Sequence, residues 1–248
     1  MLSQKLTLAA AGNAAADRTY VDDVFSTFLY DGTGSAQTIT NGIDLSGEGG
    51  MVWLKRRDSS TQYSVYDTAR GRNAGFLRTD SSAAQFAMTG IYTTYGLTSF
   101  NNNGFSLGSA LNNENDTNAD HVGWTFRKCP GFFDIVTYTG DGSYARNISH
   151  NLGSVPGSVW VKRLSGNDDW VVYHRGTDSS SPQDYVTFLN EPYARSNNDL
   201  FADTAPTASV FTIGSNVKLN GNGETYVAYL FAHDEPVFGE NGDQSIIK

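Results

Sequence analysis

The sequence predicts an all-β protein in which two tandem, homologous β-sandwich modules of jelly-roll or lectin-like type follow a short N-terminal arm. Three observations support this fold class. The 248 residues include 26 glycines, 13 tyrosines and 14 phenylalanines, a balance typical of all-β proteins with many turns. Short apolar or alternating blocks are separated by Gly, Asn, Asp and Ser, as strands are separated by turns. Most of these blocks occur twice in the same order, which indicates a duplication.

The clearest repeated block is "GGMVWLKRR", which begins at Gly49 and returns as "PGSVWVKRL" at Pro156. In the same way "FLYDGTG" matches "VTYTGDG", "YSVYD" matches "WVVYH", "GFSLGS" matches "VFTIGS", and "HVGWTF" matches "YVAYLF". The spacing between copies is nearly constant, so insertions fall in loops. Each copy spans about 105 residues and about six to eight strands, which fits a β-sandwich and exceeds the length of a propeller blade.

These matches divide the chain into four parts. Residues 1–24 form an Ala-rich arm, residues 25–130 repeat A, residues 131–235 repeat B, and residues 236–248 a tail or the start of a further strand. The tail ends in "DQSIIK", which echoes the apolar lead into the first strand of repeat B. We therefore expect the arm and the tail to be assembly elements, in a longer repeat array or by adding a strand to a neighbouring sheet.

The duplicated Trp-Lys-Arg block reads as a strand with two apolar faces. Val52 and Leu54 point to one side of it, and Met51, Trp53 and Lys55 to the other, because side chains alternate along a strand. Apolar groups on both faces indicate a strand between two layers or beneath a loop. We expect core or interface positions for all four tryptophans, Trp53, Trp124, Trp160 and Trp170.

Composition argues against nucleic-acid binding, membrane insertion and internal disulfides. The 17 Lys and Arg against 26 Asp and Glu give a net charge of −9, which repels a phosphate backbone, so nucleic acid is not an expected partner. No stretch approaches the ~20 apolar residues that a membrane span needs, and we expect no membrane insertion. The single cysteine, Cys129, permits no internal disulfide, so stability must come from packing.

Motifs for catalysis or a cofactor are missing from the sequence. The four histidines form no HExxH or HxH pairing, and no GxSxG elbow supplies a nucleophile. The adjacent acids Asp168 and Asp169 read as turn residues rather than as a catalytic pair. We therefore expect a non-enzymatic protein without a cofactor. A glycosidase is the least favoured alternative, because sandwich folds host many functions.

The densest set of oxygen ligands lies in "LNNENDTNAD", residues 111–120. Glu114, Asp116 and Asp120 are candidate Ca²⁺ ligands there, since hard cations accept carboxylate oxygens. The order of an EF-hand loop with its central glycine is absent, and turn chemistry favours an exposed acidic hairpin over a metal site.

Two less patterned loops are the better candidates for a recognition surface, because loops tolerate variation. Residues 90–103 carry Tyr92 and Tyr95, and residues 190–206 carry Tyr193 and Arg195. Tyrosine offers both an aromatic face for stacking on a sugar and a polar group.

Several blocks also carry a family resemblance. "WTFRKCPGFFDIVTYTGDG", "HNLGSVPG" and "DWVVYH" together resemble the repeated domains of large virion structural proteins, described as tail-fibre-like or lectin-like, of tailed bacteriophages of marine bacteria, including cyanophages. The resemblance extends from about residue 21 to the end of the chain. It implies a part of the virion and supplies no catalytic residues.

From the resemblance and the repeats together, we expect a tail-associated fibre or adaptor that contributes to host attachment. Its expected location is the particle surface, on the tail rather than the head. Its expected partners are other virion proteins, further copies of the chain, since fibres gain avidity from repeated weak contacts, and a host surface glycan. A capsid decoration protein and a carbohydrate-binding lectin-like module are the alternatives.

Overall fold

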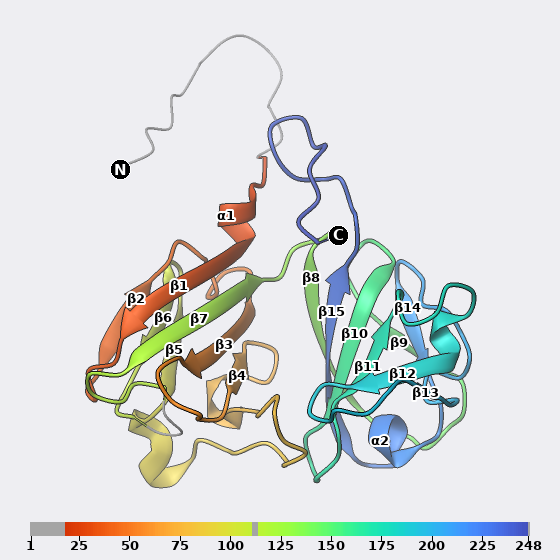
Figure 1. The fold of residues 1–248 in the computed structure, drawn as a ribbon, viewed down its shortest axis with the longest axis horizontal. Helices are drawn as coiled ribbons and strands as arrows, with labels where there is room; N and C mark the ends of the chain where they lie inside the picture. Colours follow the sequence, from red (N-terminus) through yellow and green to blue (C-terminus); the bar gives the residue numbers. More distant parts are fainter. Residues whose placement is uncertain (1–17, 111–113, 248) are drawn as a thin grey trace.

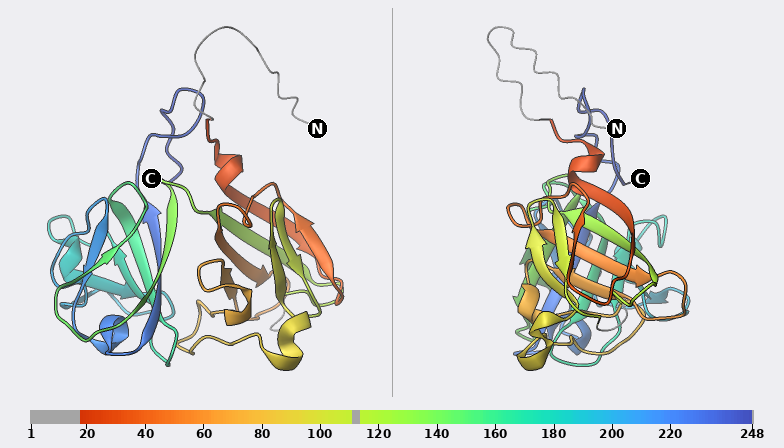
Figure 2. Two further views of the ribbon diagram at one scale, coloured as in Figure 1. Left: turned by 180° about the vertical axis from the view of Figure 1, so that it is seen from behind. Right: turned by 90° about the vertical axis from the view of Figure 1, so that its left-hand side faces the viewer.

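The computed structural model describes residues 18–110 and 114–247 and confirms the all-β fold class. The described residues form fifteen strands, and the α-helices α1 (Val21–Val24) and α2 (Val217–Asn220) are single turns. The strands fall into two halves that lie side by side, the first made of β1 to β7 and the second of β8 to β15 (Figures 1 and 2). No helix among the described residues is long and apolar enough to cross a bilayer.

Each half packs a large antiparallel sheet against a small one, as in a β-sandwich. In the first half the large sheet has the order β1-β7-β3-β4 and the small one β2-β6-β5. These strands are β1 (Phe25–Asp31), β2 (Gln37–Thr40), β3 (Gly50–Arg56), β4 (Ser64–Asp67), β5 (Leu97–Asn101), β6 (Gly104–Leu107) and β7 (Asp120–Arg127), with the 3₁₀ turns η1 (Arg72–Ala74) and η2 (Gly90–Thr94).

The second half repeats this order and extends it. Its large sheet is β8-β15-β10-β11-β12-β13, and β9 pairs with β14. The duplicated Trp-Lys-Arg block forms β3 in one half and β10 in the other, each beside the last strand of its half. The strands are β8 (Phe133–Thr139), β9 (Arg146–Ser149), β10 (Pro156–Arg163), β11 (Val171–His174), β12 (Tyr185–Phe188), β13 (Ser196–Asn197), β14 (Val210–Ile213) and β15 (Thr225–Ala232), with the 3₁₀ turn η3 (Pro182–Asp184).

The shared four-strand order is what a duplicated module would produce, but the tandem homologous modules, their jelly-roll or lectin-like type and their exact boundaries stay predictions. The predicted boundary after residue 24 falls where β1 begins, and the boundary after residue 130 falls between β7 and β8. The Ala-rich part of the arm, residues 1–17, lies outside the described residues.

The described residues form three apolar cores. One fills the first sandwich, one fills the second, and a third lies between the two large sheets. We call this third core, together with the polar contacts that cross it, the junction. In β3, Val52 and Leu54 enter the first sandwich, whereas Met51 and Trp53 face the junction, so the predicted alternation is confirmed. A strand buried on both sides needs apolar residues at successive positions, which is why the block "MVWL" is apolar throughout.

The tail folds back over one end of the junction (Figure 1). Phe238 is 1% exposed within the junction core, and Ile246 and Ile247 pack against it. The backbone N–H of Asp234 donates to the Ile247 carbonyl at 2.6 Å. The apolar pair that the sequence indicates as the start of a strand therefore packs on this chain's own core, and the structure assigns no strand to residues 236–247.

Candidate binding sites at the junction

The duplicated block is structural in both copies, and its tryptophans meet. The Trp53 and Trp160 rings lie 5.9 Å apart, edge to face, across the junction. Trp160 also lies 4.6 Å from Phe231, and Trp53 lies 5.4 Å from Trp124 on the neighbouring strand. Aromatic pairs at these separations stabilise an interface beyond the area they bury. The prediction of core or interface positions is confirmed for Trp53 and Trp160.

The lysines and arginines of the block form internal contacts. Arg56 pairs with Asp58 at 2.6 Å and with Asp116 at 2.9 Å. Its counterpart Arg163 pairs with Glu224 at 2.8 Å. Lys162 is fully buried, and its Nζ donates to the Ser82 carbonyl of the first half at 3.2 Å. Burial lowers the pKa of Lys162 to about 8.

The acidic loop does not gather its carboxylates around one point. Glu114 is buried, Asp116 is bound to Arg56, and Asp120 is exposed at the start of β7. Residues 111–113 of the same stretch lie outside the described residues. Within 18–110 and 114–247, no three His, Cys, Asp or Glu side chains form a group that could hold a metal. The structure therefore places Glu114, Asp116 and Asp120 in three separate surroundings.

Glu114 is instead a carboxyl group of the first sandwich core. Its Oε1 accepts hydrogen bonds from Ser64 at 2.9 Å and from Tyr66 at 2.8 Å, and its Oε2 has no partner among the described residues. Burial raises the pKa of Glu114 to about 7, against the two hydrogen bonds, which lower it. The sequence does not reveal this burial, because Glu114 lies in a stretch rich in polar residues.

Replacing Glu114 by glutamine is expected to remove a pH dependence of stability. A folded pKa of about 7 against an ordinary 4.5 means that the folded state binds the proton more tightly. The contribution of Glu114 is thus fully present below pH 4.5 and is lost as the pH rises through 7, by about 3 kcal/mol in total. Denaturant unfolding at several pH values measures the free energy of unfolding of the variant and of the wild type. Between acid pH and pH values above 7, the stability of the variant relative to the wild type should increase by this amount.

The comparison of variant with wild type is needed because other buried groups titrate with the opposite sign. Burial lowers the pKa of His121 and of His150, so their contributions rise with pH through their folded pKa values. If the difference in the free energy of unfolding between Glu114→Gln and wild type stays constant from acid to neutral pH, the burial of an ionisable carboxyl group at Glu114 is contradicted.

The histidines have separate structural surroundings. The His121 ring is buried and stacks on Tyr30 at 5.0 Å. His150 accepts the Leu152 N–H at Nδ1 (3.3 Å), which leaves Nε2 to donate to the Thr207 carbonyl at 3.2 Å. His174 is exposed, and its Nδ1 accepts the Gly176 N–H at 3.0 Å. These three rings are held by local contacts.

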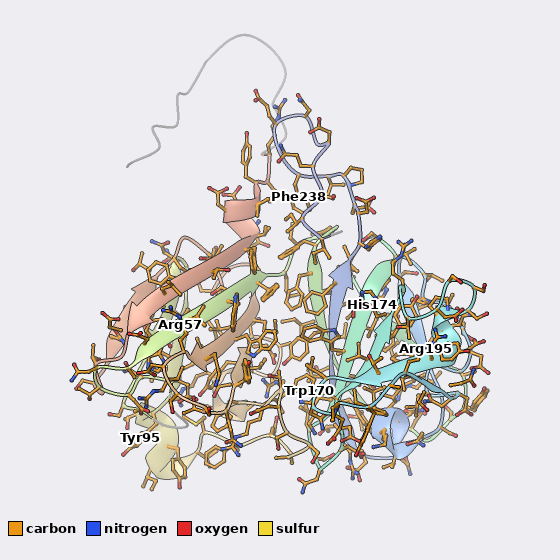
Figure 3. The ribbon with its side chains drawn as sticks, viewed as in Figure 1. Arg57, Tyr95, Trp170, His174, Arg195 and Phe238 are labelled. Atoms are coloured by element: carbon orange, nitrogen blue, oxygen red, sulfur yellow. The ribbon has the colours of Figure 1, made fainter. Side chains whose placement is uncertain are left out.

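The predicted recognition loops lie in different halves. Tyr95 is in the first half and Arg195 is at the far side of the second half (Figure 3). Tyr92 is exposed on η2, with its ring 5.3 Å from Phe86 and 6.3 Å from Tyr95. Tyr193 is 66% exposed, and Arg195 pairs with Asp178 at 2.9 Å and lies over the Tyr185 ring at 4.3 Å. The structure thus provides two separate aromatic surfaces rather than one combined site.

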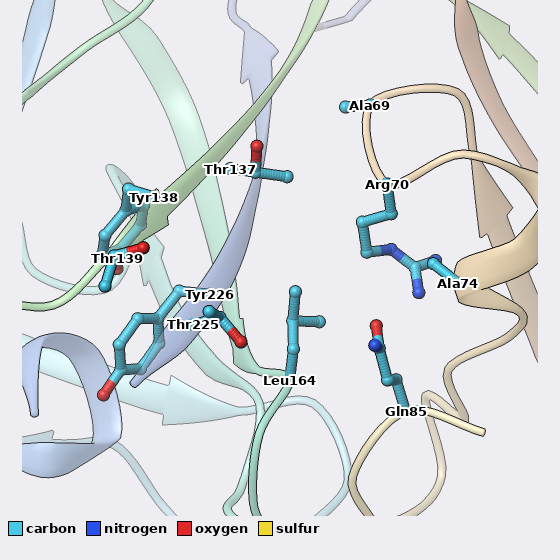
Figure 4. A pocket seen from close by; sticks show the side chains of 10 residues that line it. All are labelled: Ala69, Arg70, Ala74, Gln85, Thr137, Tyr138, Thr139, Leu164, Thr225 and Tyr226. Atoms are coloured by element: carbon cyan, nitrogen blue, oxygen red, sulfur yellow. The ribbon is translucent and has the colours of Figure 1, made fainter. Parts of the chain in front are cut away.

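A cavity of about 480 Å³ opens at one edge of the junction (Figure 4). Arg70 and Gln85 of the first half line one wall, and Thr137, Tyr138 and Thr225 of the second half line the other. Arg70 Nη1 and Gln85 Oε1 are both buried without a hydrogen-bond partner among the described residues. Arg70 is already neutralised by its ion pair with Asp67, so this cavity carries little free positive charge.

A second cavity of about 300 Å³ lies at the junction beside Trp53. We call it the Trp53 pocket, and it is lined by Trp53, Tyr63, Thr79 and Asp80 from the first half and by Leu189 and Asn190 from the second. The sequence predicts a core or interface position for Trp53 and includes Asn190 in the predicted recognition loop 190–206, but it does not single out Asp80. Only the packing of the two halves brings Asp80 and Asn190 together.

The fold and these cavities define the class: an all-β protein with β-sandwich packing whose halves enclose small pockets where they meet. The chain belongs to the family described as "Domain of unknown function (DUF7483)", whose model matches residues 21–239 and so includes both halves. No curated protein and no solved structure matches the chain.

Proposed function

We propose that this chain is a non-enzymatic structural protein of a bacteriophage particle, a tail-associated fibre or adaptor component that contributes to host attachment. The bacteriophage assignment is supported by the resemblance of this sequence to the repeated domains of virion structural proteins. The blocks that carry the resemblance belong to the framework: "DWVVYH" contains β11, and "HNLGSVPG" connects β9 to β10. A framework shared in this way supports a common architecture more than a common ligand.

One observation carries the structural role: the two halves are joined by a continuous apolar core rather than by a flexible linker. Buried side chains from both halves contribute to this core, including Met51 and Val65 from the first and Tyr229 and Phe231 from the second. Because interiors are close-packed, such a junction resists relative movement of the halves. Such a rigid unit suits a structural component, because it can hold neighbouring parts of a larger assembly at fixed positions.

Placement on the particle is tested by electron microscopy with an antibody against this chain. Gold label on the tails of purified particles is expected. Label on the head would favour a capsid decoration protein, and a chain missing from purified particles would overturn the virion assignment.

The carbohydrate-binding alternative is favoured by a separate observation, the aromatic lining of the Trp53 pocket. The two functions are compatible in one chain, because host attachment by a tail component requires a surface that binds the host. Further copies of the chain would raise the avidity of such binding.

A further inference from the structure

We propose that the Trp53 pocket binds a neutral saccharide, an inference that deepens the attachment role and rests on it. At about 300 Å³ the cavity lies at the lower end of the roughly 300 to 1,000 Å³ typical of small-molecule sites. Its wall is made by both halves, so the site exists only when the junction is formed. This size fits one or two sugar units rather than a long chain.

The aromatic wall is held in place before any ligand arrives. The Trp53 and Tyr63 rings lie 5.8 Å apart at an angle of 48°. The Trp53 ring also packs against Trp124 at 5.4 Å and Trp160 at 5.9 Å, and the Lys55 ammonium lies 4.9 Å from the Tyr63 ring centroid. Aromatic faces suit the apolar C–H face of a sugar ring, and a wall that is already ordered avoids an entropy cost on binding.

The Asp80 carboxylate in the lining suits a hydroxyl group. Asp80 is exposed, and its carboxylate has no ion-pair partner among the described residues, which leaves its oxygens free to accept. Asn190 of the second half is fixed in place, because its Oδ1 accepts the backbone N–H of Trp170 at 2.8 Å and its Nδ2 donates to Asp169 at 3.0 Å. The buried indole N–H of Trp53 has no acceptor within the described parts of the chain.

Charge decides between neutral and acidic ligands. Asp80 lines the pocket itself, and Glu191 follows Asn190 in the chain and accepts from its Nδ2 at 3.2 Å. Asp80 in the lining and Glu191 beside Asn190 outnumber the Lys55 ammonium, which lies over Tyr63. With a net charge of −9 on the chain, this balance disfavours a ligand that carries a carboxylate or sulfate group. A purely apolar ligand would strip water from Asp80 without replacing its hydrogen bonds. A ligand rich in hydroxyl groups and free of charge meets both conditions.

The test uses the full chain on a glycan array that carries neutral, sialylated and uronic acid glycans, followed by titration of the best neutral oligosaccharide with tryptophan fluorescence as readout. Asp80→Ala is expected to weaken binding by at least about tenfold, because it removes hydrogen bonds to a charged acceptor. Tyr63→Ala is expected to weaken it by a similar factor through loss of the aromatic wall.

Asp31→Ala is the matched control, since Asp31 is also an exposed carboxylate without an ion-pair partner among the described residues, and it lies outside the pocket on β1. It should leave affinity unchanged. An unchanged melting temperature in Asp80→Ala shows that the loss is local. The proposal is overturned if no neutral glycan binds, if only acidic glycans bind, or if Asp80→Ala and Tyr63→Ala both leave the affinity unchanged.

The outcome is separable from the test of the virion assignment. A chain found on particles that binds no neutral glycan would overturn the pocket and keep the structural role. A chain that binds neutral glycans through Asp80 but is missing from particles would keep the pocket and overturn the assignment to a virion.

Discussion

Asp67→Ala is expected to lower the free energy of unfolding by about 3 to 5 kcal/mol, the range for removing one partner of a buried ion pair. Asp67 and Arg70 have side chains only 0% and 2% exposed. Asp67 Oδ2 accepts from Arg70 Nε and also from the Tyr229 hydroxyl, at 2.6 Å, so one carboxylate joins the first half to the second. Its loss leaves a buried guanidinium without a counter-charge and a buried hydroxyl without an acceptor.

Denaturant unfolding measures this loss, and an exposed ion pair provides the control. Asp58 pairs with Arg56 at 2.6 Å, but the two side chains are 33% and 26% exposed. Asp58→Ala should lower the free energy of unfolding far less than Asp67→Ala, because ion pairs in contact with solvent contribute little to stability. If Asp67→Ala lowers the free energy of unfolding no more than Asp58→Ala does, the contact of Asp67 across the junction contributes little to stability.

Trp170→Ala is expected to cost a similar amount, about 3 to 5 kcal/mol, through the cavity it leaves. The Trp170 side chain is fully buried between the halves, 6.0 Å from the Tyr229 ring (Figure 3). Its Nε1 donates to the Arg78 carbonyl of the first half at 2.8 Å. The substitution therefore removes apolar packing and a hydrogen bond that crosses the junction.

Trp170→Phe separates these two effects, since phenylalanine retains most of the ring volume but not the donor. We expect it to be clearly less destabilising than Trp170→Ala. Tyr193→Ala, at a side chain that is 66% exposed, should change stability by no more than about 0.5 kcal/mol. Equal costs for Trp170→Ala and Tyr193→Ala in denaturant unfolding would contradict the burial of Trp170.

The strand content and the two-faced character of β3 could be predicted because they depend on local patterns. Alternation of Val52 and Leu54 with Met51 and Trp53 is visible in the sequence, and it already requires an apolar layer on each side. Which residues form the second layer cannot be predicted from local sequence. That Trp53 meets Trp160 follows from how two large sheets pack, which no spacing along the chain expresses.

The candidate sites were harder to predict for the same reason. Turn chemistry predicts an exposed acidic hairpin for residues 111–120, but the Glu114 side chain is buried in the core and Asp116 pairs with Arg56. Nothing in the sequence distinguishes Asp80 from other loop residues, and Asn190 belongs to a predicted recognition loop whose partner in the first half the sequence does not indicate. Burial and contacts between distant segments decide both cases.

A single rigid unit joined at the junction is the central claim, and equilibrium unfolding followed by two probes tests it most directly. Trp53, Trp160 and Trp170 lie in or against the junction core, so tryptophan fluorescence reports its loss, whereas far-ultraviolet circular dichroism reports the strands of both halves. Coincident single transitions are predicted, because two halves that share a core unfold together. A fluorescence transition at lower denaturant than the loss of strand signal would show that the halves separate before they unfold, and would contradict the claim.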